Sequence, residues 1–328
     1  MSETFDVIVV GAGIAGAVAA RTLADRGLRV VVVEKSRGVG GRMATRRFGG
    51  GIFDHGAQFF TARDPRFQRW VDRWVASGVA ARWFRRPGRS GMEVGYRGVP
   101  SMTAPAKQLQ AGLSVRRETL VVAVGFDERR RKVSVRVQDD SVLEAGHAIL
   151  TAPVPQALAL LEAGGVALPP EVQVQLEAVR YAPCFALMAV LNEAPAGLPE
   201  SGFLEFAEGP VSWLADNTRK GVANGRTAVT IHGSSEFSAE NFEASPEVVT
   251  AALLAAVKRW IPAKTVAATS LHRWRYARPV ATLTARRVAW CGDRLVICGD
   301  AFGGARVEGA ALSGLEAGEA VAARLNLQ

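Results

Sequence analysis

The chain has few cysteines and no long hydrophobic run, and each shortage excludes a class of protein. Its 328 residues include three cysteines, and their positions match no metal-binding or redox spacing. We therefore expect no metal site, and we expect Cys184, Cys291 and Cys298 to be small buried side chains in a reducing cytoplasm. No apolar run approaches the roughly 18 residues that a membrane-spanning helix needs. The amino-terminal segment lacks the basic start of a signal peptide, so we expect neither secretion nor a membrane partner.

Lysine is also scarce, which bears on the partners of this basic chain. The net charge is +9, yet lysine supplies only six of the 40 basic residues. No basic run alternates with aromatic residues that would stack on bases, so we expect no nucleic-acid partner. Two interpretations of the positive charge stay open. It forms either a basic cleft that attracts an anionic dinucleotide or phosphorylated substrate, or a solvated surface.

What the sequence does contain begins with a β-α-β unit at the amino terminus. Phe5–Val10 is a β-rich run, and residues 17–25 follow the glycines with a helical pattern that ends at Gly27. Arg29–Val33 is a second β-branched run, and Glu34 closes it.

The turn inside this unit matches the dinucleotide-binding fingerprint G-x-G-x-x-G. Its first glycine permits the tight turn, its second lets a pyrophosphate approach the backbone, and its third lets the helix pack on the strand. The free N–H groups at the helix start favour phosphate, and Glu34 is placed to accept hydrogen bonds from ribose hydroxyls. The residues of the motif are Gly11, Gly13, Ile14, Ala15 and Gly16.

The rest of the chain divides into a meander and a second group of elements. Residues 36–51 are rich in glycine and arginine and predict a long functional loop. Residues 64–77 predict a helix with an apolar stripe on one face. Strand patterns at 120–126, 133–138 and 142–145 predict an antiparallel meander, and residues 147–150 predict a short buried strand. From about residue 181 the strands lengthen, and Ser245 caps a helix expected over Pro246–Trp260, with proline and glutamate in its first turn. This second group predicts a substrate domain.

A second glycine cluster identifies the expected dinucleotide. Gly40-Gly41-Arg42 follows Glu34 closely, and here the chain resembles the amine-oxidase-type FAD superfamily. In that family the Gly-Gly-Arg segment lies beside the pyrophosphate, which suits a planar guanidinium. The resemblance implies that Lys35, Gly41 and Arg42 help to bind FAD.

The carboxy-terminal part carries the other half of this resemblance. Residues 296–300 form a buried strand that runs into Gly-Asp, and in the family this aspartate, here Asp300, contacts the ribityl or pyrophosphate portion of FAD. Gly309 and Ala310 would open a last helix whose dipole faces the flavin. Val122 corresponds to a residue whose backbone meets the adenine.

The resemblance implies the α/β class, with a Rossmann-type, GR2/amine-oxidase-like FAD-binding domain and a discontinuous mixed α+β substrate domain. We assign residues 1–70, 100–155 and 268–328 to the FAD-binding domain, and residues 71–99 and 156–267 to the substrate domain. His55 and the cysteines lack a flavin-attachment context, so we expect non-covalent FAD. Because the chain has one fingerprint only, a nicotinamide substrate would have to bind in a non-Rossmann pocket against the flavin.

Several segments resemble one branch of the superfamily, the renalase-like proteins. Members of this branch use FAD and O2 to oxidise the 2- and 6-dihydro isomers of NAD(P)H to NAD(P)+, with hydrogen peroxide as by-product. The chain differs from bacterial members at residues 281–293 and 302–305. The resembling segments are residues 35–43, 56–64, 153–157, 272–279 and 306–310.

Four residues are candidates for the substrate pocket. Gln58 either bonds a carboxamide or the flavin edge, or is a structural amide. His232 is a pocket residue or a satisfied strand histidine, and Trp274 or Tyr276 forms a ring-stacking wall or plain core. Further candidates with surface or structural alternatives are Arg278 as a phosphate contact, Asn217 and Arg219.

Hydride loss from a dihydropyridine needs no general base, because the product is an aromatic pyridinium. The sequence shows no obvious acid–base pair and no lysine in a pocket motif. This is consistent with the substrate that the resemblance implies, a small anionic dihydronicotinamide dinucleotide, with O2 as oxidant. An FAD-dependent amine oxidase or desaturase of the same superfamily stays open as an alternative. A non-catalytic FAD-binding protein is the third possibility.

Overall fold

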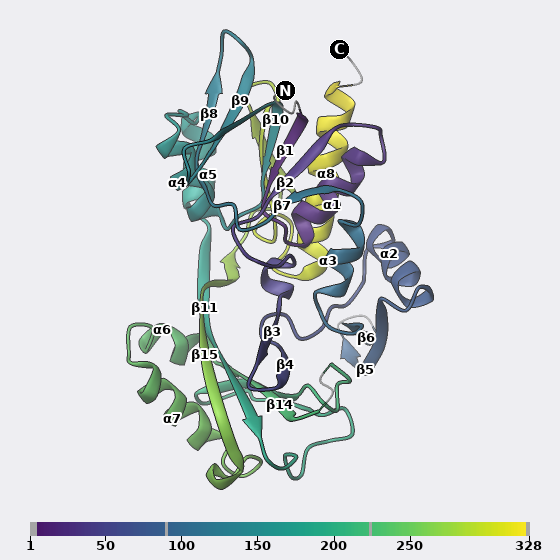
Figure 1. The fold of residues 1–328 in the computed structure, drawn as a ribbon, viewed down its shortest axis with the longest axis vertical. Helices are drawn as coiled ribbons and strands as arrows, with labels where there is room; N and C mark the ends of the chain where they lie inside the picture. Colours follow the sequence, from purple (N-terminus) through teal and green to yellow (C-terminus); the bar gives the residue numbers. More distant parts are fainter. Residues whose placement is uncertain (1–4, 89–90, 223–224, 326–328) are drawn as a thin grey trace.

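The molecule is built on two β-sheets joined by a pair of long strands (Figure 1). The computed structural model describes residues 5–88, 91–222 and 225–325. One sheet lies at the end that carries both termini, and the other lies at the opposite end. Within these residues no helix is long and apolar enough to cross a bilayer.

The first sheet is the Rossmann-like core that the sequence predicts. Its strands follow the order β16-β17-β10-β1-β2-β7, parallel except for β16 at one edge. Two further strands, β8 (Val121–Asp127) and β9 (Lys132–Val137), extend the long β10 as the expected antiparallel meander. The bounds of the others are β1 (Phe5–Val10), β2 (Val30–Val33), β7 (Ser114–Arg116), β10 (Val142–Leu150), β16 (Arg287–Trp290) and β17 (Leu295–Cys298). The α/β class is confirmed.

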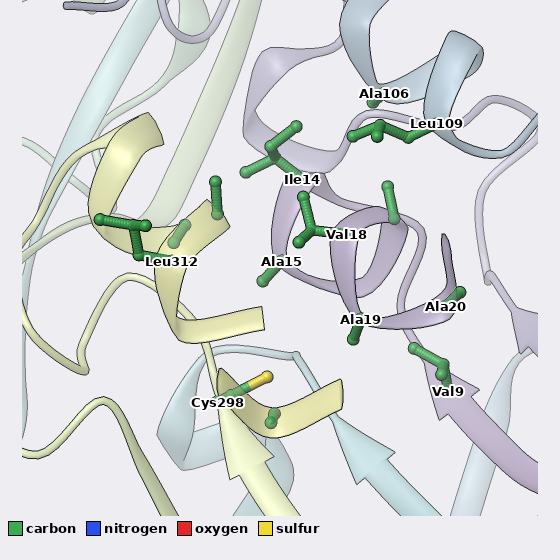
Figure 2. Close-up of a cluster of buried hydrophobic side chains, with 14 of the residues drawn as sticks. Val9, Ile14, Ala15, Val18, Ala19, Ala20, Ala106, Leu109, Cys298 and Leu312 are labelled. Carbon is green, nitrogen blue, oxygen red and sulfur yellow. The ribbon is translucent and has the colours of Figure 1, made fainter. Parts of the chain in front are cut away.

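Two helices, α1 (Ile14–Ala24) and α8 (Val307–Leu325), pack side by side through small residues (Figure 2). A Cβ atom at Gly314 would overlap the carbonyl oxygen of Ala15, and one at Gly318 would lie 3.0 Å from that of Ala19. Contacts that advance by four residues on both helices show that the helices run parallel. Their amino-terminal ends therefore point the same way, toward the cavity described below.

The remaining helices cover the sheets or connect them. The helix expected over 64–77 is α2, and Asp64 caps it by accepting from the Arg66 N–H. The helix expected at Ser245 begins there but ends at Ala256. Their bounds are α2 (Pro65–Ala76), α3 (Ala104–Leu109), α4 (Val154–Ala163), α5 (Pro170–Glu177), α6 (Ser235–Glu240) and α7 (Pro246–Ala256), with 3-10 turns η1 (Gly41–Met43) and η2 (Ala263–Thr265).

The second sheet is antiparallel and has the order β12-β13-β14-β11-β15. Its longest strand, β15, pairs with β11 from Val266 to Ala281. Residues 268–281 were assigned to the FAD-binding domain. In the structure they belong to the 16-residue strand β15, and its pairing with β11 makes them part of the second sheet. The bounds are β11 (Arg180–Leu191), β12 (Phe203–Glu205), β13 (Val211–Asp216), β14 (Thr227–Gly233) and β15 (Val266–Ala281).

Two hairpins complete the fold. The loop expected over residues 36–51 ends at residue 44 and contains η1. The chain then forms the hairpin of β3 (Thr45–Phe48) and β4 (Gly51–Asp54). Its turn uses Gly49 and Gly50, both with positive φ. The other hairpin pairs β5 (Ala80–Gly88) with β6 (Gly91–Gly98).

Candidate functional site

A cavity of about 2160 Å³ runs from the glycine-rich turn to the second sheet. Its FAD half is lined by the turn after β1, the end of β2, residues 35–44 and Asp300. Its substrate half is lined by β3, β5, residues 55–61, β14, β15 and residues 305–307. The two halves form one continuous space.

The glycine-rich turn leaves bare backbone at the floor of the FAD half. Gly11 has φ +108°, and a Cβ there would lie 2.5 Å from the Thr151 Oγ1. A Cβ at Gly16 would overlap the Gly11 carbonyl oxygen, so this glycine is needed for the helix to pack on the strand. At Gly13 the nearest atom to an added Cβ is the Gly41 Cα at 4.0 Å. This open cradle, at the start of α1, fits the pyrophosphate of FAD.

Glu34 lies at the end of β2 with its carboxylate fixed. The side chain is 7% exposed. Its Oε2 accepts from the Ala12 N–H at 2.8 Å, and its Oε1 accepts from the Ser36 N–H at 2.8 Å. Each carboxylate oxygen has a second lone pair, and both Glu34 and Lys35 line the cavity. The carboxylate is thus positioned to accept hydrogen bonds from ribose hydroxyls.

Arg42 and Asp300, the two residues expected near the diphosphate and ribityl groups, contact each other. The Arg42 Nη1 and Nη2 atoms donate to the two Asp300 oxygens at 2.5 and 2.8 Å. Nη1 also donates to the Tyr276 carbonyl at 3.2 Å. This two-pronged pair joins the Gly-Gly-Arg segment to the end of β17 across 258 residues of sequence.

The start of α8 reaches the cavity through Val307 and Ala310. Gly309 lies behind them, where a Cβ would overlap the Gly304 carbonyl oxygen. The Glu308 carboxylate accepts from the Arg63 and Asp64 N–H groups at 2.6 and 2.7 Å. Its charge is therefore directed away from the cavity, and the partial positive charge of the helix start faces it.

Most of the predicted cofactor residues line the cavity, and three do not. Gly16 and Gly309 lie behind the wall as packing glycines. Val121, not Val122, lines the cavity, because successive residues of a strand point to opposite faces. The lining residues are Gly11, Gly13, Ile14, Ala15, Glu34, Lys35, Gly41, Arg42, Asp300 and Ala310.

The four predicted pocket residues, Gln58, His232, Trp274 and Tyr276, all line the cavity. The side-chain amide of Gln58 is hydrogen-bonded through its nitrogen and not through its oxygen. Its Nε2 donates to the carbonyl oxygens of Asp54 and Gly56 at 2.5 and 3.1 Å. Its Oε1 is buried and has no partner among the described residues. This oxygen can accept an N–H from a ligand.

Three of the four histidines in the chain gather beside Trp274. The His55 ring stacks on Trp274 at 5.2 Å between centroids, and the His272 ring lies 5.1 Å from His55. The Trp274 Nε1 and the His232 Nε2 both meet the His55 carbonyl oxygen, at 3.0 and 3.2 Å. The sequence predicted no role for His272. All four rings line the cavity.

These imidazoles are neutral at physiological pH. Burial, followed by the neighbouring histidines, lowers the pKa of His55 to about 3. Burial lowers the pKa of His232 to about 4. It also lowers the pKa of His272, with Arg46 as the second cause. The cluster therefore forms an uncharged aromatic wall.

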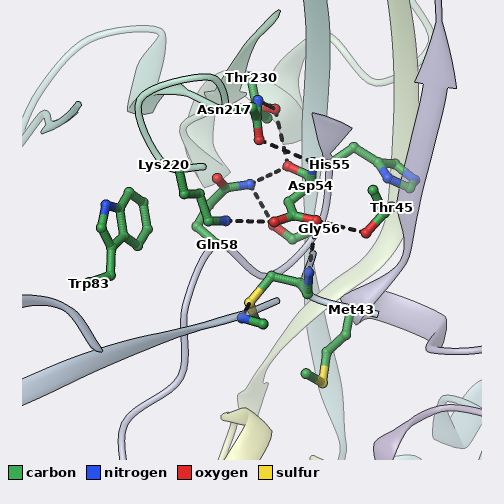
Figure 3. A network of polar contacts seen from close by, with 12 residues as sticks. Met43, Thr45, Asp54, His55, Gly56, Gln58, Trp83, Asn217, Lys220 and Thr230 are labelled. Carbon is green, nitrogen blue, oxygen red and sulfur yellow. Dashed lines mark hydrogen bonds and ion pairs between the residues drawn. The ribbon is translucent and has the colours of Figure 1, made fainter. Parts of the chain in front are cut away.

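A buried ion pair fixes the segment that carries His55 and Gln58 (Figure 3). The Lys220 Nζ lies 2.8 Å from the Asp54 Oδ2, and both side chains are fully buried. The Asp54 Oδ1 accepts from the Thr45 hydroxyl at 2.7 Å and from the Met102 N–H at 3.0 Å. Lys220 does not line the cavity, so it acts through Asp54.

The sequence suggested a pocket role for Asn217 and Arg219, but neither lines the cavity. Asn217 is buried, and its Oδ1 accepts from the Asp54 N–H at 3.2 Å. The Arg219 side chain donates to the Leu198 carbonyl at 3.2 Å. Both residues support the strands around the site.

The substrate half of the cavity is basic. Among the described residues, the acidic side chains of the whole wall are Glu34 and Asp300, both in the FAD half and both already bonded. No carboxylate of the described chain lines the substrate half. Its arginines are Arg46, Arg47, Arg86, Arg273, Arg275, Arg278 and Arg306.

Known proteins similar to this chain match either a part of it or its fold. Digeranylgeranylglycerophospholipid reductase of Methanocella arvoryzae is 34% identical over 105 residues, 29% of this chain and 24% of the relative. 3-Oxosteroid 1-dehydrogenase of Mycobacterium tuberculosis is 55% identical over 51 residues, 16% of this chain and 9% of the relative. The chain thus covers about a quarter or less of the length of these relatives.

Solved structures resemble the whole chain. An engineered putrescine oxidase aligns with a TM-score of 0.76 over 99% of this chain and 100% of its own, at 17% identity. A protein described as a protoporphyrinogen oxidase from Exiguobacterium aligns with a TM-score of 0.73 over 98% and 100%, at 14% identity. At such identities the likeness is one of fold.

Family models match nearly the full length. The NAD(P)-binding Rossmann-like domain model matches residues 9–74. The model described as flavin containing amine oxidoreductase matches residues 75–322, more than half of the chain. Together with a cradle that fits a dinucleotide, this makes FAD the cofactor. The chain belongs to the flavin-containing amine oxidoreductase family and is an FAD-dependent oxidoreductase.

Proposed function

We propose that the chain is a renalase-like oxidase that converts the 2- or 6-dihydro isomers of NAD(P)H to NAD(P)+ and reduces O2 to H2O2. The observation that carries this proposal is the substrate half of the cavity, which is lined by arginines and aromatic rings and, within the described residues, by no carboxylate. Such a wall favours an anionic substrate with a flat ring.

The residues of the site match what this reaction requires of a protein. Bound FAD, held without a covalent link, supplies the hydride acceptor and passes the electrons on to O2. A dihydropyridine loses no separate proton, so the neutral imidazoles of His55 and His232 need not act as bases. Trp274 stacked on His55 forms a wall for the ring, and the free Oε1 of Gln58 can accept an N–H of the carboxamide. These groups bind, orient and exclude water.

The alternative of an amine substrate is disfavoured by charge. Alkylamines are cations at neutral pH, and in this cavity they would meet arginines without a compensating carboxylate. Lys220, which is buried and paired to a carboxylate, is outside the cavity wall. The fold it shares with putrescine oxidase supports the amine alternative, but fold does not determine substrate.

Cytoplasmic localisation is part of the proposal. The three cysteines are all free in the structure, which suits a reducing compartment.

An anaerobic reduction experiment tests the function. Holoprotein is mixed with 2- or 6-dihydroNAD(P), and flavin absorbance is followed by stopped flow. Rapid bleaching with these isomers and slow bleaching with 4-dihydroNADH is expected. Bleaching by amines or polyenes alone would establish the alternative instead. If no compound of either class bleaches the flavin, the chain is a non-catalytic FAD-binding protein and the proposal fails.

A further inference from the structure

A second, smaller cavity adjoins the substrate half of the large one. Its volume is about 340 Å³, and it is lined by Arg278, Pro279, Val280, Ala305 and Arg306. It lies where β15 passes the loop ahead of α8. Arg278, Ala305 and Arg306 also line the large cavity, so the two spaces are contiguous.

The charge of this small cavity is not balanced by acidic groups. The guanidinium group of Arg278 has no hydrogen-bond or ion-pair partner within the part of the chain that the structure describes. Arg306 lies 3.8 Å from the Glu93 Oε1. That carboxylate is already paired with Arg63 at 2.5 Å and Arg86 at 3.4 Å. Arg86 is also paired with Glu205 at 2.5 Å. Three guanidinium groups therefore share two carboxylates, and excess positive charge remains beside Arg278.

The position of the small cavity relates it to the ring-binding wall. Trp274 and Arg278 both belong to β15, and the pairing of this strand with β11 is irregular between them, because Cys184 pairs with Trp274 and Ala182 pairs with Arg278. Their partners on β11 are only two residues apart, so Trp274 and Arg278 are separated by about 7 Å along the sheet. A ribose and a long arginine side chain together span this distance. A flat ring stacked at Trp274 would thus direct its ribose-linked group toward Arg278.

We propose that Arg278 and Arg306 form the subsite for the phosphate attached to the ribose of the dihydronicotinamide substrate. This inference rests on the proposed function and adds to it a requirement for a phosphorylated substrate. Two guanidinium groups from separate segments can bind phosphate oxygens in the two-pronged geometry that arginine favours. The subsite would distinguish nucleotides from the corresponding nucleosides.

Binding of the oxidised products to the holoprotein tests the subsite without turnover. Nicotinamide mononucleotide and nicotinamide riboside differ by one phosphate, and calorimetry gives the Kd of each. We expect Arg278→Gln and Arg306→Gln each to raise the mononucleotide Kd about 10- to 100-fold, because charged hydrogen bonds to phosphate are lost. The riboside Kd should not change. The KM of dihydronicotinamide mononucleotide should rise in parallel, while that of the dihydronicotinamide riboside stays constant.

Controls separate the subsite from folding and from total charge. Both arginines are exposed, so their neutral variants should retain FAD, which the ratio of flavin to protein absorbance checks. Arg278→Lys keeps the charge and should retain part of the phosphate preference. Arg69→Gln removes an exposed arginine of α2 that does not line the cavity, and it should leave both Kd values unchanged.

Three results would overturn the subsite. Equal weakening of riboside and mononucleotide would mean that the arginines act on the ring or the flavin. A phosphate effect confined to Arg46→Gln and Arg47→Gln would place the phosphate on the β3 side. An unchanged mononucleotide Kd would remove the role altogether. In each case wild-type bleaching by dihydronicotinamides would persist, whereas loss of that bleaching would defeat the proposed function itself.

Discussion

At the scale of single residues, the pair of Asp54 and Lys220 has the largest expected effect on stability. Both side chains are fully buried. Burial lowers the pKa of Lys220, and the negative charge of Asp54 raises it in part. Lys220→Met would leave the carboxylate buried and unpaired, and we expect a loss of about 3–5 kcal/mol in the free energy of unfolding. Urea unfolding followed by tryptophan fluorescence measures it.

The double variant Asp54→Asn, Lys220→Met is the matched control for this pair. It removes both charges at once, so it should recover much of the stability that Lys220→Met loses. If the single variant were as stable as the wild type, the ion pair would not hold the segment that carries His55 and Gln58.

Glu34 gives a prediction about cofactor retention. Glu34→Ala removes the acceptor for ribose hydroxyls and also the partner of the Ala12 and Ser36 N–H groups. We expect FAD to dissociate about 10- to 100-fold more readily, with little change in the rate of hydride transfer once FAD is bound. Equilibrium titration with FAD measures the first quantity and stopped flow the second. Full FAD retention with abolished hydride transfer would contradict this role.

Single residues also show the limit of sequence reasoning about the site. The fingerprint glycines and Glu34 could be predicted because their chemistry depends on local spacing within one β-α-β unit. Lys220 could not, since Thr218, Arg219 and Gly221 around it are typical of a polar turn. Its burial depends on a carboxylate 166 residues away. His272 was missed for the same reason, because only the folded β15 brings it beside His55.

At the scale of elements, the parallel contact between α1 and α8 leaves no room for a larger side chain at Gly314. The carbonyl oxygen of Ala15 occupies the position that a Cβ of Gly314 would need. Gly314→Ala must push the helices apart, and we expect a loss of about 1–3 kcal/mol in stability from overpacking. Because both helix starts face the cavity, FAD affinity should fall as well.

Thermal unfolding of apo- and holoprotein checks this expectation. Gly38→Ala serves as the control for the stability of the apoprotein, because a Cβ there meets no protein atom within 4 Å. A Gly314→Ala protein with unchanged stability would show that the helices can move apart without cost.

Elements whose residues follow a local pattern were predicted well, and those set by tertiary contacts were not. Strand β1 and helix α2 follow from a β-rich run and from an apolar stripe with an Asp64 cap. The hairpin of β3 and β4 was missed because Thr45–Phe48 contains two arginines and no alternation. The full length of β15 was missed too, because its pairing with β11, not its composition, extends it to Ala281.

At the scale of the whole molecule, buried neutral histidines link stability to pH. Burial lowers the pKa of His55 to about 3 and those of His147 and His232 to about 4. Their pKa in the unfolded chain is about 6.5. Between pH 6.5 and 4 the unfolded state therefore binds more protons than the folded state. The contribution of these three histidines to the free energy of unfolding is complete above pH 6.5 and is lost as the pH falls toward 4.

Each histidine should contribute a slope of up to about 1.4 kcal/mol per pH unit in that window. The window is distinct from that of the paired carboxylates, such as Asp6 and Glu144. Arginine partners lower the pKa values of these carboxylates, so their contribution is lost only below about pH 4. Urea unfolding at a series of pH values from 4 to 8 separates the two ranges.

His147 is the best position for testing this link, because it lies in β10, away from the cavity. Both ring nitrogens are buried, and neither has a partner in the described chain. His147→Phe should keep a ring of similar volume. It should reduce the slope of the free energy of unfolding against pH between pH 6.5 and 4 by the amount that one proton contributes. It should leave flavin reduction unchanged. If the slope of stability against pH were the same in this variant and in the wild type, the acid sensitivity would have to come from groups other than the buried imidazoles.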